Sequence, residues 1–236
     1  MVNKQYDQEK LSQKFVLILQ FTDDAMSLQK NEEEDFNDDS ETDTAKLKIG
    51  SQETAYKLFF HKILMSLRGV RLLNTELGKP KFTSQRDTST FFFISKKLGT
   101  DSIEYKFYVP HREVLQSQDI ETDIVVVVNK MVFGRYTEDT GPGYLPGYVV
   151  HTPGGTMTTG GSWTGGGPSK FLHASFEYVI YDYDQQAVIT YGASHITAGL
   201  GNMIIGSNQM CFEKIAYEIF KHSPFTWKEK TYFESN

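Results

Sequence analysis

Two aspartates, Asp182 and Asp184, have the spacing in this chain that most directly suggests chemistry. An Asp-x-Asp pair of this kind can hold a metal-bound sugar nucleotide. The pair also lies between two segments with the composition of β-strands, and aspartates at such a junction commonly hydrogen-bond the local backbone of a turn. We therefore expect a hairpin turn here, with a sugar-nucleotide site as the alternative.

The six histidines offer a second route to catalysis. None of them lies at the i, i+4 spacing of a helical zinc motif, so no metal site is predicted. His151 and His195 lie near glycine-rich segments and could meet Asp184 in the fold, under a glycine-rich lid. An enzyme with a loop-covered site near these three residues is thus one hypothesis, although each histidine alone is better explained as a surface residue. No catalytic residue and no cofactor is assigned.

Most catalytic and nucleotide-binding signatures are missing. The chain has no Gly-x-Ser-x-Gly nucleophile elbow. Residues 167–170, Gly-Pro-Ser-Lys, place a proline where a phosphate-binding loop needs Gly-Lys-Ser/Thr, and they lead into a strand. The net charge is −6, and residues 31–44 hold eight acids and no base, which leaves +2 for the rest of the chain. Neither a nucleotide site nor a nucleic-acid surface is therefore expected.

Recognition is the remaining class of function, and residues 135–170 are its candidate site. Ten of the chain's 19 glycines lie between Gly141 and Gly167. Aromatic residues on an adaptable backbone of glycine, serine and threonine are typical of a contact surface. Two alternatives stay open: a loop folded back over an edge of the sheet, or a hairpin whose strands join neighbouring copies or enter a membrane. The candidate binding residues in this segment are Tyr136, Tyr144, Tyr148 and Trp163.

The elements that must position these residues are organised around a run of four valines, Val125–Val128. Such a run predicts a strand buried on both faces, so we place it at the centre of a sheet. Capping residues and apolar spacing predict a helix over residues 51–69, which forms a β-α-β unit with parallel strands on either side. The other expected strands are residues 14–21, 70–74, 103–109, 171–181 and 187–192, and the other expected helices are residues 88–99, 111–118 and 207–222.

These elements predict an α/β (α+β) fold, in which a mixed β-sheet has helices packed on it. With 236 residues and 39% hydrophobic content, the chain is long enough to bury the core of one domain. The expected organisation is an N-terminal tail (1–13), a single domain (14–225) and a C-terminal tail (226–236). Within the domain, residues 22–50 form an acidic loop and residues 135–170 form a long glycine-rich insertion.

Cysteine content and apolar segments bear on the compartment. Cys211 is the single cysteine, which excludes an internal disulfide, and its place in an expected helix indicates an inert buried thiol. No window approaches the roughly 18 consecutive apolar residues of a membrane helix, so no integral membrane segment is expected. The first ten residues lack the apolar region of a secretory signal. We expect a cytoplasmic protein, or a periplasmic one from which a signal has been trimmed.

Several features of the second half of the chain occur together in a known group of proteins. They are a valine-rich strand opened by Asp123, a Gly/Ser-rich insertion, and the segments Phe171–Asp184 and Ala187–Gly192. In these features the chain resembles small bacterial envelope lipoproteins whose domain is like the N-terminal domain of TolB, the core of the curli secretion channel and the lipoprotein activators of penicillin-binding proteins. The resemblance implies a non-enzymatic α/β domain, exported and lipid-anchored, that binds a partner or assembles. The chain departs from this group in showing neither a signal peptide nor a lipobox cysteine.

The sequence thus favours a non-enzymatic binding or assembly protein of the cell envelope. In this hypothesis a rigid α/β body presents residues 135–170 to a protein partner or to other copies of itself. The aromatic residues of that segment supply apolar contact area, and its glycines supply conformational reach.

Overall fold

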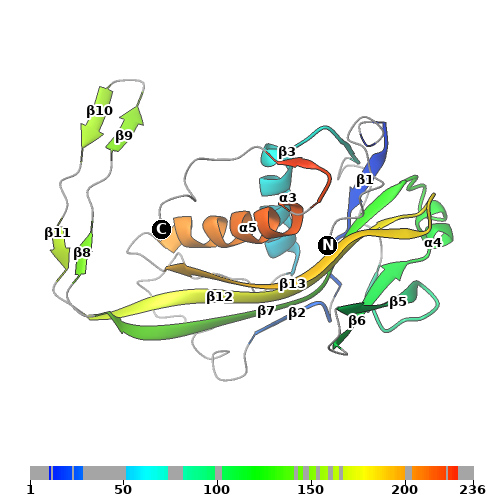
Figure 1. Ribbon diagram of the computed structural model, residues 1–236, viewed down its shortest axis with the longest axis horizontal. Coiled ribbons are helices and arrows are strands. Elements are labelled where there is room, and N and C mark those ends of the chain that lie inside the picture. Colours follow the sequence, from blue (N-terminus) through cyan, green and yellow to red (C-terminus); the bar gives the residue numbers. More distant parts are fainter. Residues whose placement is uncertain are drawn as a thin grey trace.

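A long, twisted β-sheet with two helices on one face and a β-hairpin on the other makes up the body of the protein, as seen in a computed structural model (Figure 1). Helices and a mixed sheet together confirm the predicted α/β fold class. The structure describes residues 11, 13–22, 24–28, 52–73, 82–98, 103–140, 143–145, 149–152, 155–158, 162–164, 167–199, 204–221 and 223–227.

The main sheet has six strands: β1 (Phe15–Ile18), β2 (Met26–Leu28), β4 (Arg71–Leu72), β7 (Ile124–Thr140), β12 (Gly167–Asp182) and β13 (Ala187–Gly199). Their order is β13-β12-β7-β1-β4, and β2 also pairs with β7. The valine strand β7 lies between antiparallel β12 and parallel β1, so its predicted central position is confirmed. The parallel pairing of β1 with β4 confirms the predicted β-α-β unit.

Two helices, α3 (Gln52–Ser66) and α5 (Ile204–Phe220), cover one face of the sheet. Their apolar stripes pack on alternate residues of β7 and β12 and form the larger part of the core. Lys62 of α3 is bonded to Glu213 of α5 at 3.3 Å. Both helices were predicted, and α5 buries Cys211 as expected. No helix in the described part of the chain is long and apolar enough to cross a membrane.

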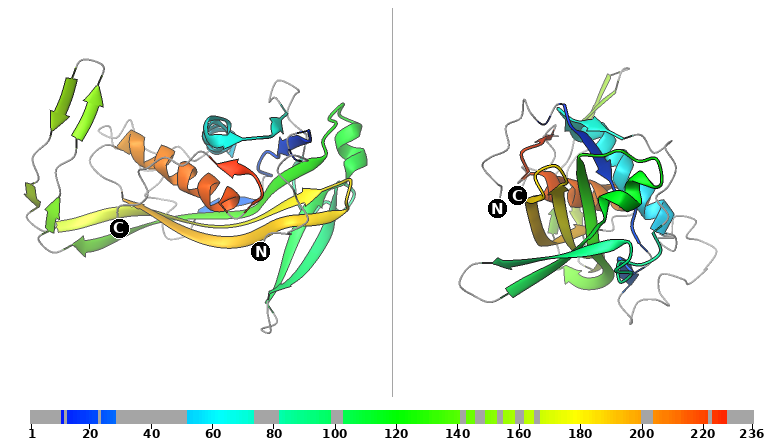
Figure 2. Two further views of the ribbon diagram at one scale, coloured as in Figure 1. Left: turned by 45° about the horizontal axis from the view of Figure 1, so that its top comes forward. Right: turned by 90° about the vertical axis from the view of Figure 1, so that its right-hand side faces the viewer.

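The opposite face is covered at one end by a hairpin of β5 (Phe91–Leu98) and β6 (Ile103–Pro110), which projects away from the helices (Figure 2). Phe107 of β6 is fully buried, and its ring centroid lies 5.5 Å from that of Tyr191 on β13. The predicted helix over residues 88–99 is therefore wrong. Its aromatic side chains gain more by packing between β6 and the sheet than the capping residues at its ends gain in a helix.

The remaining elements complete the body. The short helix α4 (Arg112–Gln116) lies where a helix was predicted. A two-residue strand after residue 225, β14 (Thr226–Trp227), pairs with β3 (Leu67–Arg68). Most of the predicted acidic loop at residues 22–50 lies outside the described residues, as does most of the N-terminal tail.

Candidate functional site

The glycine-rich insertion connects the two longest paired strands of the protein. β7 has 17 residues and β12 has 16, and they pair as an antiparallel ladder from Ile124 and Asp182 to Thr140 and Gly167. At about 3.3 Å per residue, β7 is roughly 55 Å long. The helices lie over the middle of this ladder, and its far end, toward β8 and β11, extends beyond them (Figure 1).

Two shorter ladders continue the same hairpin beyond β7 and β12. Strand β8 (Gly143–Leu145) pairs with β11 (Ser162–Thr164), and β9 (Val149–Thr152) pairs with β10 (Gly155–Thr158). All three ladders share one register from the pair Lys130 and Glu177 outward, because the two residue numbers of every pair add to 307. The described residues thus form one hairpin, with inner, middle and outer ladders.

This geometry bears on the glycine-rich insertion at residues 135–170, for which the sequence left open a loop or a hairpin. Its described residues are strands, as in the alternative that the sequence left open. Glycine weakens a strand because it costs backbone entropy and adds no packing side chain. The long β7–β12 ladder already fixes the register of the two strands. Each further pair of residues therefore forms without the cost of closing another loop.

The four candidate binding residues are distributed along this hairpin. Tyr136 is the direct partner of Phe171 in the inner ladder, and Tyr144 is the direct partner of Trp163 in the middle ladder. Aromatic residues at directly opposite positions stabilise an antiparallel pair. The side chains at these positions, and all of Tyr148, lie outside the described part of the chain.

From residue 135 outward, the part of each ladder in the hairpin has one rung at which both residues are apolar or aromatic: Tyr136 with Phe171, Tyr144 with Trp163, and Val150 with Met157. In all three rungs, the residue on the first strand of the ladder (β7, β8 or β9) has an even number. Because side chains alternate between the two faces of a strand, such positions share one face where a strand is uninterrupted. The odd-numbered rungs include Thr137 with Lys170, Gly143 with Thr164 and His151 with Thr156.

The outer edges of the hairpin have neighbouring strands among the described residues only where they lie against the body. The edge of β7 that faces away from β12 pairs with β1 and β2 as far as Phe133. The edge of β12 that faces away from β7 pairs with β13 as far as Phe171. Beyond these points, no described strand pairs with the outer edge of residues 135–140 or 167–170. A row of backbone N–H and C=O groups at such an edge is a template for the addition of another strand.

At the opposite end of the ladder, Asp182 and Asp184 form the turn between β12 and β13. Oδ1 of the buried Asp182 accepts hydrogen bonds from the backbone N–H groups of Asp184 at 2.9 Å and Gln185 at 3.1 Å. Its Oδ2 accepts a bond from Nζ of Lys14 at 2.9 Å. The predicted structural turn is confirmed.

Asp184 joins this turn to two other elements. Its carboxylate binds Lys14 at 3.2 Å, just before β1, and Arg112 of α4 at 2.8 Å. Burial raises the pKa of the Asp184 carboxyl, but the hydrogen bonds and charges of Lys14 and Arg112 outweigh it and hold that pKa below its usual value. Burial likewise lowers the pKa of Lys14, and its bonds to the two aspartates raise it overall. These carboxylates are occupied in holding the fold together.

The structure does not bring the residues of the enzyme hypothesis together. Asp184 lies in the turn that opens β13, whereas His195 lies roughly 25 Å further along that strand. The backbone of His151 pairs with Thr156 in the outermost ladder, and its side chain lies outside the described part. Among the described residues, no three or more His, Cys, Asp and Glu side chains are grouped so that they could hold a metal ion.

Neither a scan against protein-family models nor a search of curated proteins gives a match for this chain. The fold and site define an α/β body that carries an extended β-hairpin. We call its outer edges open because no strand in the described part of the chain pairs with them. Sequence reasoning located the insertion and its aromatic residues but missed these edges. The available signal was the alternation of apolar with small or polar residues on both arms, which becomes readable only once the register is known.

Proposed function

We propose that this protein is a non-enzymatic binding or assembly protein of the cell envelope, whose working element is the extended hairpin. The observation that supports it is the pair of open strand edges beyond Phe133 on β7 and beyond Phe171 on β12. Soluble domains usually cover or interrupt long open edges, because such edges attract other strands. Edges that continue along a hairpin are best explained as a surface that a partner covers.

Recognition would proceed by addition of a strand. A strand of the partner aligns with the outer edge of residues 135–140 or 167–170, and main-chain hydrogen bonds supply affinity that depends little on sequence. Specificity comes from the rungs occupied by Tyr136 with Phe171 and by Tyr144 with Trp163, because large aromatic residues dominate interface energetics. The body sets where these edges are presented.

The experiment compares the full chain with a variant in which residues 140–168 are replaced by a short Gly-Ser linker. The full chain carries a photo-crosslinking amino acid at position 144, and the variant carries it within the linker. The crosslinker is activated by light in cells that make either protein. We expect crosslinked species larger than the monomer for the full chain and their loss in the variant, with thermal midpoints within a few degrees. An unchanged set of crosslinked species would contradict the proposal.

The envelope location rests on the resemblance of residues 123–134 and 171–192 to envelope lipoprotein domains. Fractionation of cells that make the protein from its natural gene tests it separately from the hairpin. Recovery in the envelope fraction is expected. Recovery only in the cytosolic fraction would overturn the location and leave the hairpin proposal standing.

A second candidate function is entry of the hairpin into a lipid bilayer. The observation that favours it is the one apolar or aromatic rung that each ladder has from residue 135 outward, at an even-numbered position of β7, β8 or β9. Co-flotation of the full chain with phosphatidylcholine vesicles, abolished in the linker variant, is the expected result. Equal flotation of both chains, or of neither, would contradict it.

A further inference from the structure

Two histidines face each other on the sheet surface away from the helices. His195 of β13 is the direct partner of Ser175 on β12, and His173 lies two residues along β12, diagonal to His195. The ring centroids of His173 and His195 are 5.5 Å apart, with the rings tilted by 36°. Oγ of Ser175 lies 2.9 Å from Nδ1 of His195. The group therefore comprises two imidazoles and one hydroxyl on adjacent strands.

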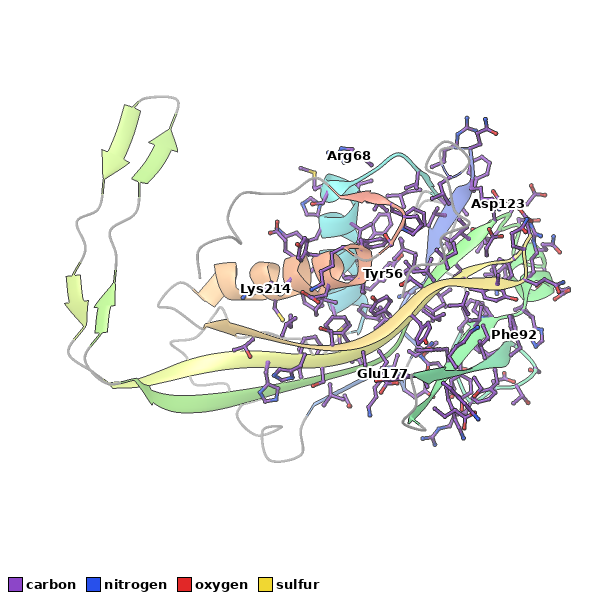
Figure 3. All side chains as sticks on the ribbon, in the orientation of Figure 1. Tyr56, Arg68, Phe92, Asp123, Glu177 and Lys214 are labelled. Carbon is purple, nitrogen blue, oxygen red and sulfur yellow. The ribbon has the colours of Figure 1, made fainter. Side chains whose placement is uncertain are left out.

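The opposite face of these strands belongs to the core, which fixes the orientation of the pair. Ala174 and Phe176 are buried under the helices, and Ser194 donates a hydrogen bond to Glu218 of α5 at 3.3 Å. The odd-numbered residues of β12, which include His173 and Ser175, thus point away from α5, as Figure 3 shows for Glu177. The β5–β6 hairpin reaches this face at Tyr191, further toward the turn.

The pair is also accessible. His195 and Ser175 are exposed, and His173 is partly exposed. Both rings are thus at least partly open to solvent.

The ring geometry fits one shared metal ion. A divalent ion about 2.1 Å from one nitrogen of each ring lies about 3.2 Å from each ring centre, so a tetrahedral angle places the centres about 5 Å apart. The ring centroids of His173 and His195 are 5.5 Å apart, which is close to this value. Coordination uses one nitrogen of each ring, and each ring has two.

Ser175 has the role of a positioning residue. When the proton of His195 is on Nδ1 and is donated to Oγ of Ser175, the lone pair of the ring is on Nε2. Hydrogen bonds to the second nitrogen of a coordinating histidine fix its tautomer and its orientation. In this tautomer, Ser175 orients His195 for coordination through Nε2.

We propose that His173 and His195 form a binding site for a divalent transition-metal ion that prefers imidazole, such as Cu²⁺, Ni²⁺ or Zn²⁺. Water completes the coordination, because the two rings supply two ligands. Ca²⁺ and Mg²⁺ prefer oxygen ligands and are not expected here. The site is independent of the proposed function of the hairpin edges.

The test is calorimetric titration of the full chain, free of any histidine tag, with Cu²⁺ and Zn²⁺ in a non-coordinating buffer. We expect one site whose affinity falls at least tenfold in His173→Ala and in His195→Ala. His61→Ala, which removes an exposed histidine from α3, is the matched control and should leave the affinity unchanged. Ser175→Ala should weaken binding several-fold while preserving the stoichiometry of one.

A second measurement uses the unmodified protein and so does not depend on the folding of a variant. Cu²⁺ broadens the nuclear magnetic resonance signals of nearby nuclei, and we expect broadening centred on residues 173–175 and 195–197. Broadening confined to other residues, such as the acidic segment 31–44, would overturn the proposal. So would unchanged affinity in both histidine variants, or the absence of any site in the wild-type titration.

Discussion

The side-chain amide of Asn129 is hydrogen-bonded to both backbone polar groups of Tyr108, like one rung of a β-ladder. Its Oδ1 accepts the N–H of Tyr108 at 3.1 Å, and its Nδ2 donates to the carbonyl at 2.8 Å. Asn129 is the extra residue of a bulge in β7, because Val128 pairs with Tyr178 and Lys130 with Glu177. The bulge frees this amide to tie the β5–β6 hairpin to the main sheet.

Replacing Asn129 with alanine should therefore destabilise the protein. The substitution removes two hydrogen bonds and leaves the backbone groups of Tyr108 without them, which costs about 2 kcal/mol of unfolding free energy. Asn129→Asp retains the acceptor but loses the donor, so it should not restore stability. Urea denaturation measures both, with exposed Glu121→Ala as the control. A loss below about 0.5 kcal/mol for Asn129→Ala would contradict this role.

Gly192 is kept small by the ring of its cross-strand partner, Tyr178. A Cβ atom at Gly192 would lie 3.1 Å from Cε1 and 3.2 Å from the hydroxyl oxygen of Tyr178, which is 4% exposed. Because the buried ring has little room to move, Gly192→Ala should lower stability by about 1 to 2 kcal/mol despite the gain in strand propensity. In a Tyr178→Leu background the same substitution should cost less. Equal costs in the two backgrounds would show that the two residues are not coupled.

Acid should weaken the junction of β1, α4 and the β12–β13 turn through Asp184. The pKa of Asp184 is lower in the folded protein than its usual value, so the unfolded chain binds the proton more tightly. The resulting stabilisation is complete above about pH 4 to 5 and is lost as the pH falls through the folded pKa. Between pH 5 and pH 3, the urea midpoint should fall less in Asp184→Asn than in the wild type. Parallel curves would contradict this contribution.

The single cysteine should be unreactive in the folded protein. Cys211 is fully buried, and burial raises the pKa of its thiol to about 12, although the nearby Lys214 lowers it. Because the thiolate is the reactive form, iodoacetamide at pH 8 should modify the denatured chain within minutes and leave the native protein unmodified over hours. Mass spectrometry distinguishes the modified chain from the unmodified chain. Rapid modification of the native protein would contradict the prediction and would show that α5 opens readily.

The parts of the fold that local sequence determines were predictable. Four consecutive valines gave the central strand, and the capped apolar stripe of residues 51–69 gave α3, because burial and periodicity act within a few residues. Residues 88–99 were assigned to a helix because their capping signals are local, whereas the packing that makes them β5 comes from distant residues.

The candidate site was predictable only in part for the same reason. The aromatic residues of the insertion can be read directly from the sequence, and the hairpin around Asp182 was recognised. The position of the hairpin edges relative to the sheet depends on which residues of β7 and β12 pair with β2 and β13, which no local pattern gives. The meeting of His173 with His195 likewise follows from the register of β12 with β13, which is set by a bulge near Ile180.

The register of the outer hairpin can be tested by engineered disulfides. Leu145 and Ser162 are direct partners in the β8–β11 ladder, so cysteines at these positions should close an intramolecular disulfide under mild oxidation. Leu145→Cys with Trp163→Cys is the matched control, because adjacent positions on β11 point to opposite faces. Buried Cys211 should not compete.

Mass spectrometry of the oxidised monomers should show the loss of two hydrogens in the first variant and mainly free thiols in the control. Closure of both pairs to the same extent would mean that this part of the hairpin has no fixed register, and the strand-addition surface would then lose its basis. Selective closure of the Leu145→Cys/Ser162→Cys pair would show that the edges are held in place before any partner arrives. The hairpin backbone would then lose little conformational entropy when a partner binds.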